Sequence, residues 1–205
     1  MKILNNFFKL ILIILLISCS KNDKVSIVKE KNIETQMIEA FKEGYSELEN
    51  GDVLFAAKKF NEAELLYPQS VWAPKAALMA AYAYYSQDYY FDAEYELKRF
   101  IKVYPNEKNI SYAHYLLGMV YYEKIVDEKK DLEPLILAED RFKFILKNYP
   151  DTDFALDATY KLNLIQDYLA SKEMYIGIHY MKKKNGLQLL IVSKMLLIIM
   201  KKPHL

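Results

Sequence analysis

Cys19 is the only cysteine among the 205 residues, and its position suggests a chemical role for its thiol. It follows an apolar run from Leu10 to Ile17 and the small residue Ser18, while Lys2 and Lys9 precede the run. A positive start, a short apolar segment and a small residue before the cut are typical of a secretory signal peptide. The run is too short for a permanent transmembrane helix.

This arrangement resembles the signal peptides of bacterial lipoproteins, in which the cysteine becomes the N-terminus and is acylated on its sulfur and its amine. We therefore expect residues 1–18 to be a signal peptide. Cys19 is expected to carry a diacylglyceryl group and an N-acyl chain, which anchor more stably than a single chain does. Because Ser20 follows the cysteine, the resemblance implies the periplasmic face of the outer membrane. We expect no cofactor other than this covalent lipid.

Other residues that could support catalysis or bind a metal are scattered. The histidines are His114, His179 and His204, and no His-Glu-x-x-His, Walker, dinucleotide-glycine or serine-elbow motif occurs. His114 falls where an expected helix needs a packing residue, so we predict a core or rim histidine. Arginine, which favours bidentate contacts to nucleic acid, occurs only at Arg99 and Arg141. The sequence predicts no enzyme, no metal site and no nucleic-acid partner.

Charge is uneven along the chain. Cys19 to Glu173 holds 20 lysines and arginines against 27 acids, whereas Met174 to Leu205 holds six lysines and no acid. The acidic part could steer basic partners, although an ordinary solvated surface is the simpler interpretation. A basic end could bind anionic lipid or nucleic acid, but we prefer the explanation that this segment is read out of frame.

Three Tyr-Pro pairs, at 67–68, 104–105 and 149–150, indicate an internal repeat. An alanine lies twelve residues before each proline and a large apolar residue lies eight before it: Ala56, Ala93 and Ala138, then Phe60, Leu97 and Phe142. The small residues Gly44, Ala81 and Gly118 precede these alanines by twelve, twelve and twenty positions. The longer third spacing implies eight inserted residues around Asp127 to Glu133. Small residues let antiparallel helices approach closely, and proline ends the second helix of a pair.

These spacings resemble the tetratricopeptide repeat, although the period is 37 residues against about 34. We predict an all-α fold over residues 34–184: a right-handed superhelical solenoid with three full repeats and a partial fourth. A generic helical bundle with coincidental alanines is the alternative. Helices are expected at 34–49, 53–66, 72–87, 90–103, 109–125, 134–148 and 154–183. The polar residues 19–33 predict a flexible tether between lipid and domain.

Residues 39–184 resemble more narrowly the BamD family of outer-membrane assembly lipoproteins. The motifs are Ala80-Ala81-Tyr82-Ala83-Tyr84-Tyr85, Arg99-Phe100-Ile101, Asn109-Ile110-x-Tyr112-x2-Tyr115-x2-Gly118 and Leu169-Ala170-x-Lys172-Glu173-Met174-x2-Gly177-x2-Tyr180. The resemblance implies a scaffold of the machinery that inserts β-barrel proteins. It would dock on the periplasmic domains of BamA beside other lipoproteins of the complex, and receive the targeting strands of unfolded precursors. Two alternatives stay open: a periplasmic adaptor regulating cell-wall synthesis or division, and a non-functional, C-terminally truncated fragment.

A repeat superhelix binds partners on its concave face, which the first helix of each pair forms. The small-residue register places ten side chains there: Phe41, Tyr45, Leu48, Leu78, Tyr82, Tyr85, Tyr112, Tyr115, Met119 and Tyr122. Tyrosine suits such a groove because it offers contact area at low entropic cost and a hydroxyl for an extended backbone. About half of these side chains could instead be core, and Tyr84 and Tyr121 are assigned to the core.

The C-terminal segment departs from the family pattern. Gly177 restarts the repeat, but Leu189, Ser193 and Lys201 stand where alanine, an aromatic residue and proline are expected. Residues 187–200 are nearly all apolar, which leaves no polar face for a surface helix, and they are short for a membrane span. We hypothesise that 185–205 is an atypical tail, read out of frame from about Gly186. A genuine apolar helix that caps the solenoid is the alternative, and resequencing of the gene separates the two.

Overall fold

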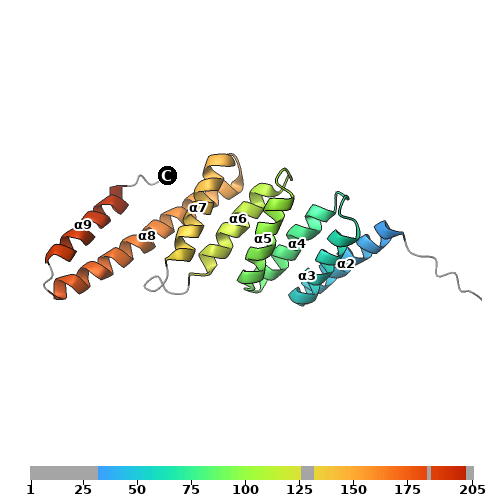
Figure 1. Cartoon of the computed structure of the whole chain (residues 1–205), viewed down its shortest axis with the longest axis horizontal. Helices are drawn as coiled ribbons and strands as arrows, with labels where there is room; N and C mark the ends of the chain where they lie inside the picture. Colours follow the sequence, from blue (N-terminus) through green and yellow to red (C-terminus); the bar gives the residue numbers. More distant parts are fainter. Residues whose placement is uncertain (1–31, 126–131, 184–185, 202–205) are drawn as a thin grey trace, which may run out of the picture. The chain divides into compact units, whose positions relative to one another are not determined.

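The computed structural model describes residues 32–125, 132–183 and 186–201, and within these ranges its regular structure is entirely helical. The helices are α2 (Ile33–Asn50), α3 (Val53–Leu66), α4 (Ala73–Ser86), α5 (Tyr90–Val103), α6 (Ile110–Glu123), α7 (Glu133–Asn148), α8 (Asp153–Lys182) and α9 (Gly186–Lys201) (Figure 1). The all-α class is confirmed, and the seven expected helices agree with α2 to α8 to within two residues at each end. The predicted signal peptide, Cys19 and nearly all of the predicted tether lie outside the described residues.

The predicted stop and start signals are found where the sequence places them. Tyr67, Tyr104 and Tyr149, each followed by proline, are the C-terminal caps of α3, α5 and α7. Proline cannot donate a backbone hydrogen bond and disfavours helical geometry in the residue before it, so each helix ends there. Pro74 and Pro134 lie in the first turns of α4 and α7, where a backbone donor is not needed.

Contacts between the helices follow the order of the chain. Each helix packs against its chain neighbours, so that α2 pairs with α3, α4 with α5, α6 with α7, and α8 with α9 (Figure 1). The first helices of successive pairs also meet, α4 with α6 and α6 with α8. A chain of pairs in which each pair rests on the next is the arrangement that helical repeats use to bury a continuous core.

Burial agrees with the predicted register of small and large apolar residues. Ala56, Ala93 and Ala138 are fully buried, as are the large apolar residues Phe60, Leu97 and Phe142. A side chain on Gly44 would put its Cβ 3.0 Å from Phe60, and one on Gly118 would put its Cβ 2.8 Å from Phe142. The two helices of these pairs therefore approach so closely that the crossing residue must be small. Tyr121 is buried as predicted, and Tyr84 is half-buried against the core.

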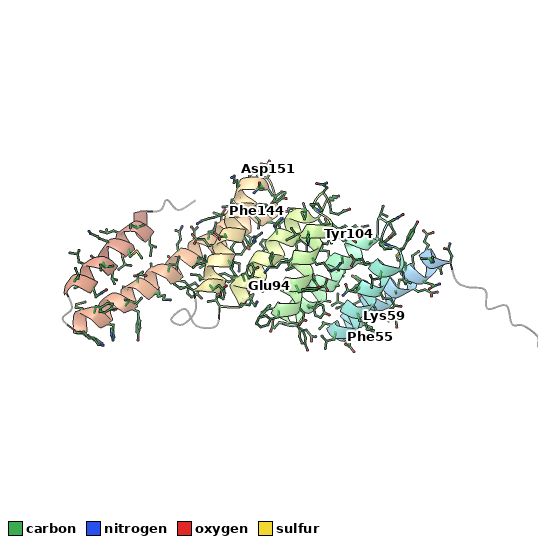
Figure 2. All side chains as sticks on the ribbon, viewed as in Figure 1. Phe55, Lys59, Glu94, Tyr104, Phe144 and Asp151 are labelled. Carbon is green, nitrogen blue, oxygen red and sulfur yellow. The ribbon has the colours of Figure 1, made fainter. Side chains whose placement is uncertain are left out.

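Charged side chains join the outer surfaces of paired helices. Lys59 on α3 lies 3.0 Å from Glu43 of α2 and 3.0 Å from Glu62 one turn further along α3. Its ammonium is also 5.5 Å from the centroid of the Phe55 ring, and both Lys59 and Phe55 can be located in Figure 2. The aliphatic stem of the lysine covers apolar surface while its charge stays near solvent.

The C-terminal segment forms a helix, α9, that packs against α8. Val192 is the buried side chain of α9 among the described residues. It packs against Gly177 of α8, where an added Cβ would lie 3.2 Å from Val192 Cγ1. A small residue on α8 thus admits a side chain of α9, as in the preceding pairs. The structure supplies a partner for one stripe of this apolar segment. Whether its codons are in frame is a question about the gene, which resequencing across Lys182 to Asn185 answers.

Candidate binding groove

Four helices that are each the first of a pair contribute to a single apolar pocket of about 520 Å³. Its lining comes from α2, α4, α6 and α8 together with the residues just before α6. The residues are Phe41, Lys75, Leu78, Met79, Tyr82, Lys108, Asn109, Ser111, Tyr112 and Phe154. Apolar atoms dominate its wall, and a few polar groups stand among them, which is the usual composition of a ligand-binding cleft.

The predicted groove residues divide into those that line this pocket and those that do not. Phe41, Leu78, Tyr82 and Tyr112 line it. Of the other six, Tyr45 is 49% exposed, Leu48, Tyr85, Tyr115 and Tyr122 are half-buried against the core, and Met119 is buried within it. The first helices therefore do converge on a cleft, and the cleft is centred at the N-terminal ends of α4 and α6.

Ring contacts fix the aromatic walls of the pocket. The Tyr112 and Phe154 ring centroids are 5.4 Å apart, and the ring of Tyr115 stacks on Phe154 at 5.2 Å. On the opposite side, Phe41 makes edge contacts at 5.3 Å with both Phe60 and Trp72. Aromatic pairs in these geometries contribute about 0.5–1.5 kcal/mol each beyond their buried area. The walls are thus held in place before any ligand binds.

Phenol groups supply the hydrogen-bonding capacity of the groove. The Tyr115 hydroxyl donates to Asp157 Oδ2 at 2.7 Å, so this group is already used. The hydroxyls of Tyr82 and Tyr112 have no hydrogen-bond partner among the described residues. Burial, with smaller effects from Tyr82 and Tyr85, raises the pKa of Tyr112 to about 12. Tyr112 therefore stays protonated and remains able to donate to a bound carbonyl.

Two lysines make the rim of the pocket positive. Lys75 and Lys108 are both exposed, and neither ammonium group pairs with a carboxylate within the part of the chain that the structure describes, although the backbone N–H of Lys108 donates to Glu107 Oε2 at 3.3 Å. The Lys75 ammonium lies 4.6 Å from the centroid of Trp72, which holds its stem over the aromatic wall. Sequence reasoning missed both lysines, as well as Met79 and Phe154, because only their place in the stacked pairs brings them to the pocket.

A smaller apolar hollow of about 260 Å³ adjoins the main pocket. Met37, Ile38, Phe41, Lys42 and Trp72 line it, so Phe41 belongs to both cavities. The two hollows together give the face of α2 and α4 an apolar surface longer than one side chain. Such a surface fits an extended segment better than a compact small molecule.

Across residues 32–125, 132–183 and 186–201, no group of three histidine, cysteine, aspartate or glutamate residues is placed to hold a metal ion. His114 is buried as predicted, and its ring lies 4.4 Å from Phe144. Its Nδ1 has no hydrogen-bond partner among the residues that the structure describes. Burial, with a smaller contribution from the charge of Arg141, lowers the pKa of His114 to about 4.

Among the helices of the described residues, none is both long enough and apolar enough to cross a bilayer. Cys19, the predicted lipidation site, lies outside the described ranges.

Comparison with known proteins gives consistent matches over most of the chain. Residues 33–197 match the family model YfiO, described as an outer membrane lipoprotein. The chain is 35% identical over 151 residues to the outer membrane protein assembly factor BamD of Caulobacter vibrioides, covering 74% of this chain and 49% of that protein. It is 35% identical over 145 residues to BamD of Rickettsia prowazekii, covering 71% of this chain and 58% of that protein. The chain thus spans about half the length of the curated relatives it matches.

Helix pairs that each pack on the next, with an apolar cleft lined by their first helices, define an all-helical protein of the helical-repeat type. The match over residues 33–197 then gives the particular family: the chain belongs to the YfiO family of outer membrane lipoproteins. Its curated relatives carry the name BamD, and the resemblance to BamD seen in the sequence is confirmed.

Proposed function

We propose that this protein is a lipid-anchored scaffold of the machinery that assembles β-barrel proteins in the outer membrane. The relatives are named as outer membrane protein assembly factors, which supports this role. The observation that carries the proposal is the apolar pocket shared by α2, α4, α6 and α8. A pocket built from four successive pairs suits a long, unfolded client segment better than a small substrate.

The proposed client is the extended C-terminal targeting strand of an unfolded barrel precursor. Alternate side chains of an extended strand point to one side, so aromatic residues of the client could fill the space between Phe41, Tyr112 and Phe154. The hydroxyls of Tyr82 and Tyr112, which have no hydrogen-bond partner in the described part of the chain, could donate to its backbone carbonyls. Lys75 and Lys108 would attract the terminal carboxylate, and attraction at an exposed rim chiefly raises the association rate.

The protein would be attached to the membrane by lipid and would dock on other proteins of the assembly machinery. Acyl chains on Cys19 would hold the protein at the periplasmic face of the outer membrane. The right-handed superhelical solenoid, with three full repeats and a partial fourth, would dock on the periplasmic domains of BamA beside other lipoproteins of the complex. The protein would need no cofactor beyond its lipid, bind no nucleic acid and catalyse no reaction.

Fluorescence anisotropy with the purified chain tests the groove. The probe is a labelled decapeptide with alternating apolar residues that ends in phenylalanine with a free carboxylate. Tyr82→Ala and Met79→Ala should each weaken its binding about tenfold, as loss of a contact of about 1.4 kcal/mol would. Tyr95→Ala is the matched control, because Tyr95 is 67% exposed on α5, away from the pocket.

A change in the peptide tests whether the two lysines recognise its carboxylate. Amidation of its carboxylate should weaken binding to the unmodified chain and have no effect once Lys75 and Lys108 are both glutamine. Equal binding by the parent chain and Tyr82→Ala would refute the groove as the client site. Crosslinking in cells that captures peptidoglycan synthases, and no barrel-assembly component, would favour the cell-wall adaptor.

A further inference from the structure

The α8–α9 hairpin carries an apolar surface that nothing in the described structure covers. Helix α9 contacts only α8 among the described helices with substantial contacts, and Val192 is its buried side chain. Because α9 is apolar around most of its circumference, packing one stripe against α8 leaves the rest exposed. The exposed large apolar residues of α9 are Leu187, Leu190, Ile191, Met195, Leu197 and Ile198, with exposed fractions from 46% to 71%.

The C-terminal half of α8 adds to this surface. Met174, Ile178 and Met181 are 43% to 57% exposed and recur at the spacing of one helical face, which also includes Gly177 where α9 packs. A contiguous exposed apolar surface of this kind on a folded protein marks a place where a partner or a membrane binds.

The charge of the hairpin selects among possible covers. From Met174 to the end of the chain there are six lysines and no acidic residue. Lys182, Lys183 and Lys194 are exposed on the described part of the hairpin. Two copies of the hairpin would bring like charges together, which disfavours self-pairing. An anionic surface with an apolar layer beneath it complements both the lysines and the exposed side chains.

The length of α9 restricts its orientation. Sixteen residues at about 1.5 Å each give about 24 Å, which is shorter than the roughly 30 Å hydrocarbon core of a bilayer. No described helix meets the requirements for a membrane span. Because α9 has no continuous polar face of its own, an interfacial position depends on Lys182, Lys183 and Lys194, whose stems can reach to the headgroups while the apolar side chains stay below them.

We propose that the α8–α9 hairpin is a membrane-surface binding element, with the outer face of α9 among the acyl chains and Lys182, Lys183 and Lys194 at anionic lipid phosphates. This contact is separate from the client groove and goes beyond the scaffold role. It would give the protein a second attachment to the membrane, at the opposite end of the chain from Cys19.

Depth-dependent fluorescence quenching on the full chain tests the proposal. Ile191→Trp is made in a Trp72→Phe background, so that the only tryptophan reports on α9. Vesicles contain phosphatidylcholine with brominated acyl chains, with or without phosphatidylglycerol. The matched control is Leu65→Trp in the same background, because Leu65 is 76% exposed on α3. Attachment through the signal peptide or an acyl chain would bring both variants to the vesicle. Only a tryptophan on a helix that enters the bilayer would then be quenched.

The expected result is quenching and a blue shift of tryptophan at 191 on anionic vesicles, with little change at 65. A triple variant should raise the lipid concentration for half-maximal quenching about a hundredfold, since each lysine near an anionic surface contributes roughly fivefold. Its substitutions are Lys182→Gln, Lys183→Gln and Lys194→Gln. The charge-matched control is a triple variant with Lys58→Gln, Lys102→Gln and Lys147→Gln. This control should change the lipid concentration for half-maximal quenching little.

Three outcomes would overturn the proposal. Absence of quenching at 191 would show that α9 does not reach the acyl chains. Equal quenching on neutral and anionic vesicles would show that the lysines do not select the surface. A blue shift that grows with protein concentration and needs no vesicles would assign the apolar face to a second copy of the chain.

Discussion

At the scale of single residues, the helix crossings depend on the absence of side-chain atoms. Gly118 faces Phe142, and a Cβ there would lie 2.8 Å from the phenylalanine ring and 3.3 Å from Cβ of Arg141. Phe142 is fully buried and has no room to retreat. Gly118 has an ordinary helical backbone, so its conformation does not require glycine. The close approach of the Phe142 ring does.

We expect Gly118→Ala to lower the free energy of unfolding by about 1 kcal/mol. Alanine gains about 1 kcal/mol of helix propensity over glycine, whereas overpacking a full core costs about 1–3 kcal/mol. Urea denaturation followed by circular dichroism measures the difference. Gly186→Ala is the control, because its Cβ would meet no atom within 4 Å. Adding Phe142→Leu should recover part of the loss, and an unchanged midpoint for Gly118→Ala would contradict the steric argument.

His114 makes stability depend on pH. Its pKa is lowered to about 4 in the folded protein from an ordinary value of 6.5, chiefly by burial. Since the unfolded chain takes up the proton first, the contribution of neutral His114 is complete above about pH 6.5 and is lost as the pH falls towards 4. The loss amounts to about 3 kcal/mol, at 1.36 kcal/mol for each pH unit.

Chemical denaturation at several pH values tests this expectation. His114→Leu removes the titrating group and should flatten the fall in stability between pH 6.5 and 4. His179→Leu, at an exposed position near the end of α8, should leave the profile unchanged. Parallel profiles for the parent chain and His114→Leu would show that other groups cause the acid sensitivity.

At the scale of secondary-structure elements, side-chain ion pairs connect the second helices of successive repeats. Arg99 on α5 donates two hydrogen bonds to the Glu64 carboxylate on α3, at 2.8 and 2.6 Å, and a third to Glu96 at 2.8 Å. The hydroxyl of Tyr104, labelled in Figure 2, donates to the same Glu64 at 2.8 Å. Glu64 is buried, so its charge depends on these partners.

Arg99→Met should destabilise the protein by about 3 kcal/mol, because it leaves a buried carboxylate without its cation. Arg99→Met combined with Glu64→Leu should cost less than Arg99→Met alone, since apolar replacement of both partners is often tolerated. A double-mutant cycle in urea measures the coupling between the two residues. Glu62→Gln, at a half-exposed ion pair with Lys59, should change stability by less than about 1 kcal/mol. Additive effects at Arg99 and Glu64 would contradict a direct connection.

At the scale of the whole molecule, attachment to the membrane has two proposed sources. Acyl chains at Cys19 resist salt because they act through apolar burial, whereas the lysines of the α8–α9 hairpin act through charge and are screened by salt. Membrane fractionation of Cys19→Ala should show a large loss from the membrane pellet and a remainder that high salt reduces, because salt screens the lysines but leaves the apolar contact of α9. Mass spectrometry of the parent chain should find the N-terminus at acylated Cys19. An unmodified thiol there would refute the lipoprotein prediction.

Much of the fold follows from the sequence because local rules set it. The Tyr-Pro pairs end α3, α5 and α7 through the backbone of one residue and its neighbour. The spacing of Gly44, Gly118 and the three buried alanines determines which faces of paired helices meet, since residues three and four apart share a helical face. These interactions span a few tens of residues at most, and the sequence records them as a repeating pattern.

The groove is different, because its residues belong together only after successive pairs have stacked. The register predicted Phe41, Leu78, Tyr82 and Tyr112 as members of one face. It could not show that Lys75, Lys108 and Phe154 complete the same pocket, or that Met119 turns into the core. In the same way, no spacing rule pairs Glu64 with Arg99 across two repeats. The sequence by itself determined the helices and their pairing through local sterics, whereas the tertiary structure decided the composition of the pocket and the exposure of α9, because both depend on which faces the neighbouring pairs cover.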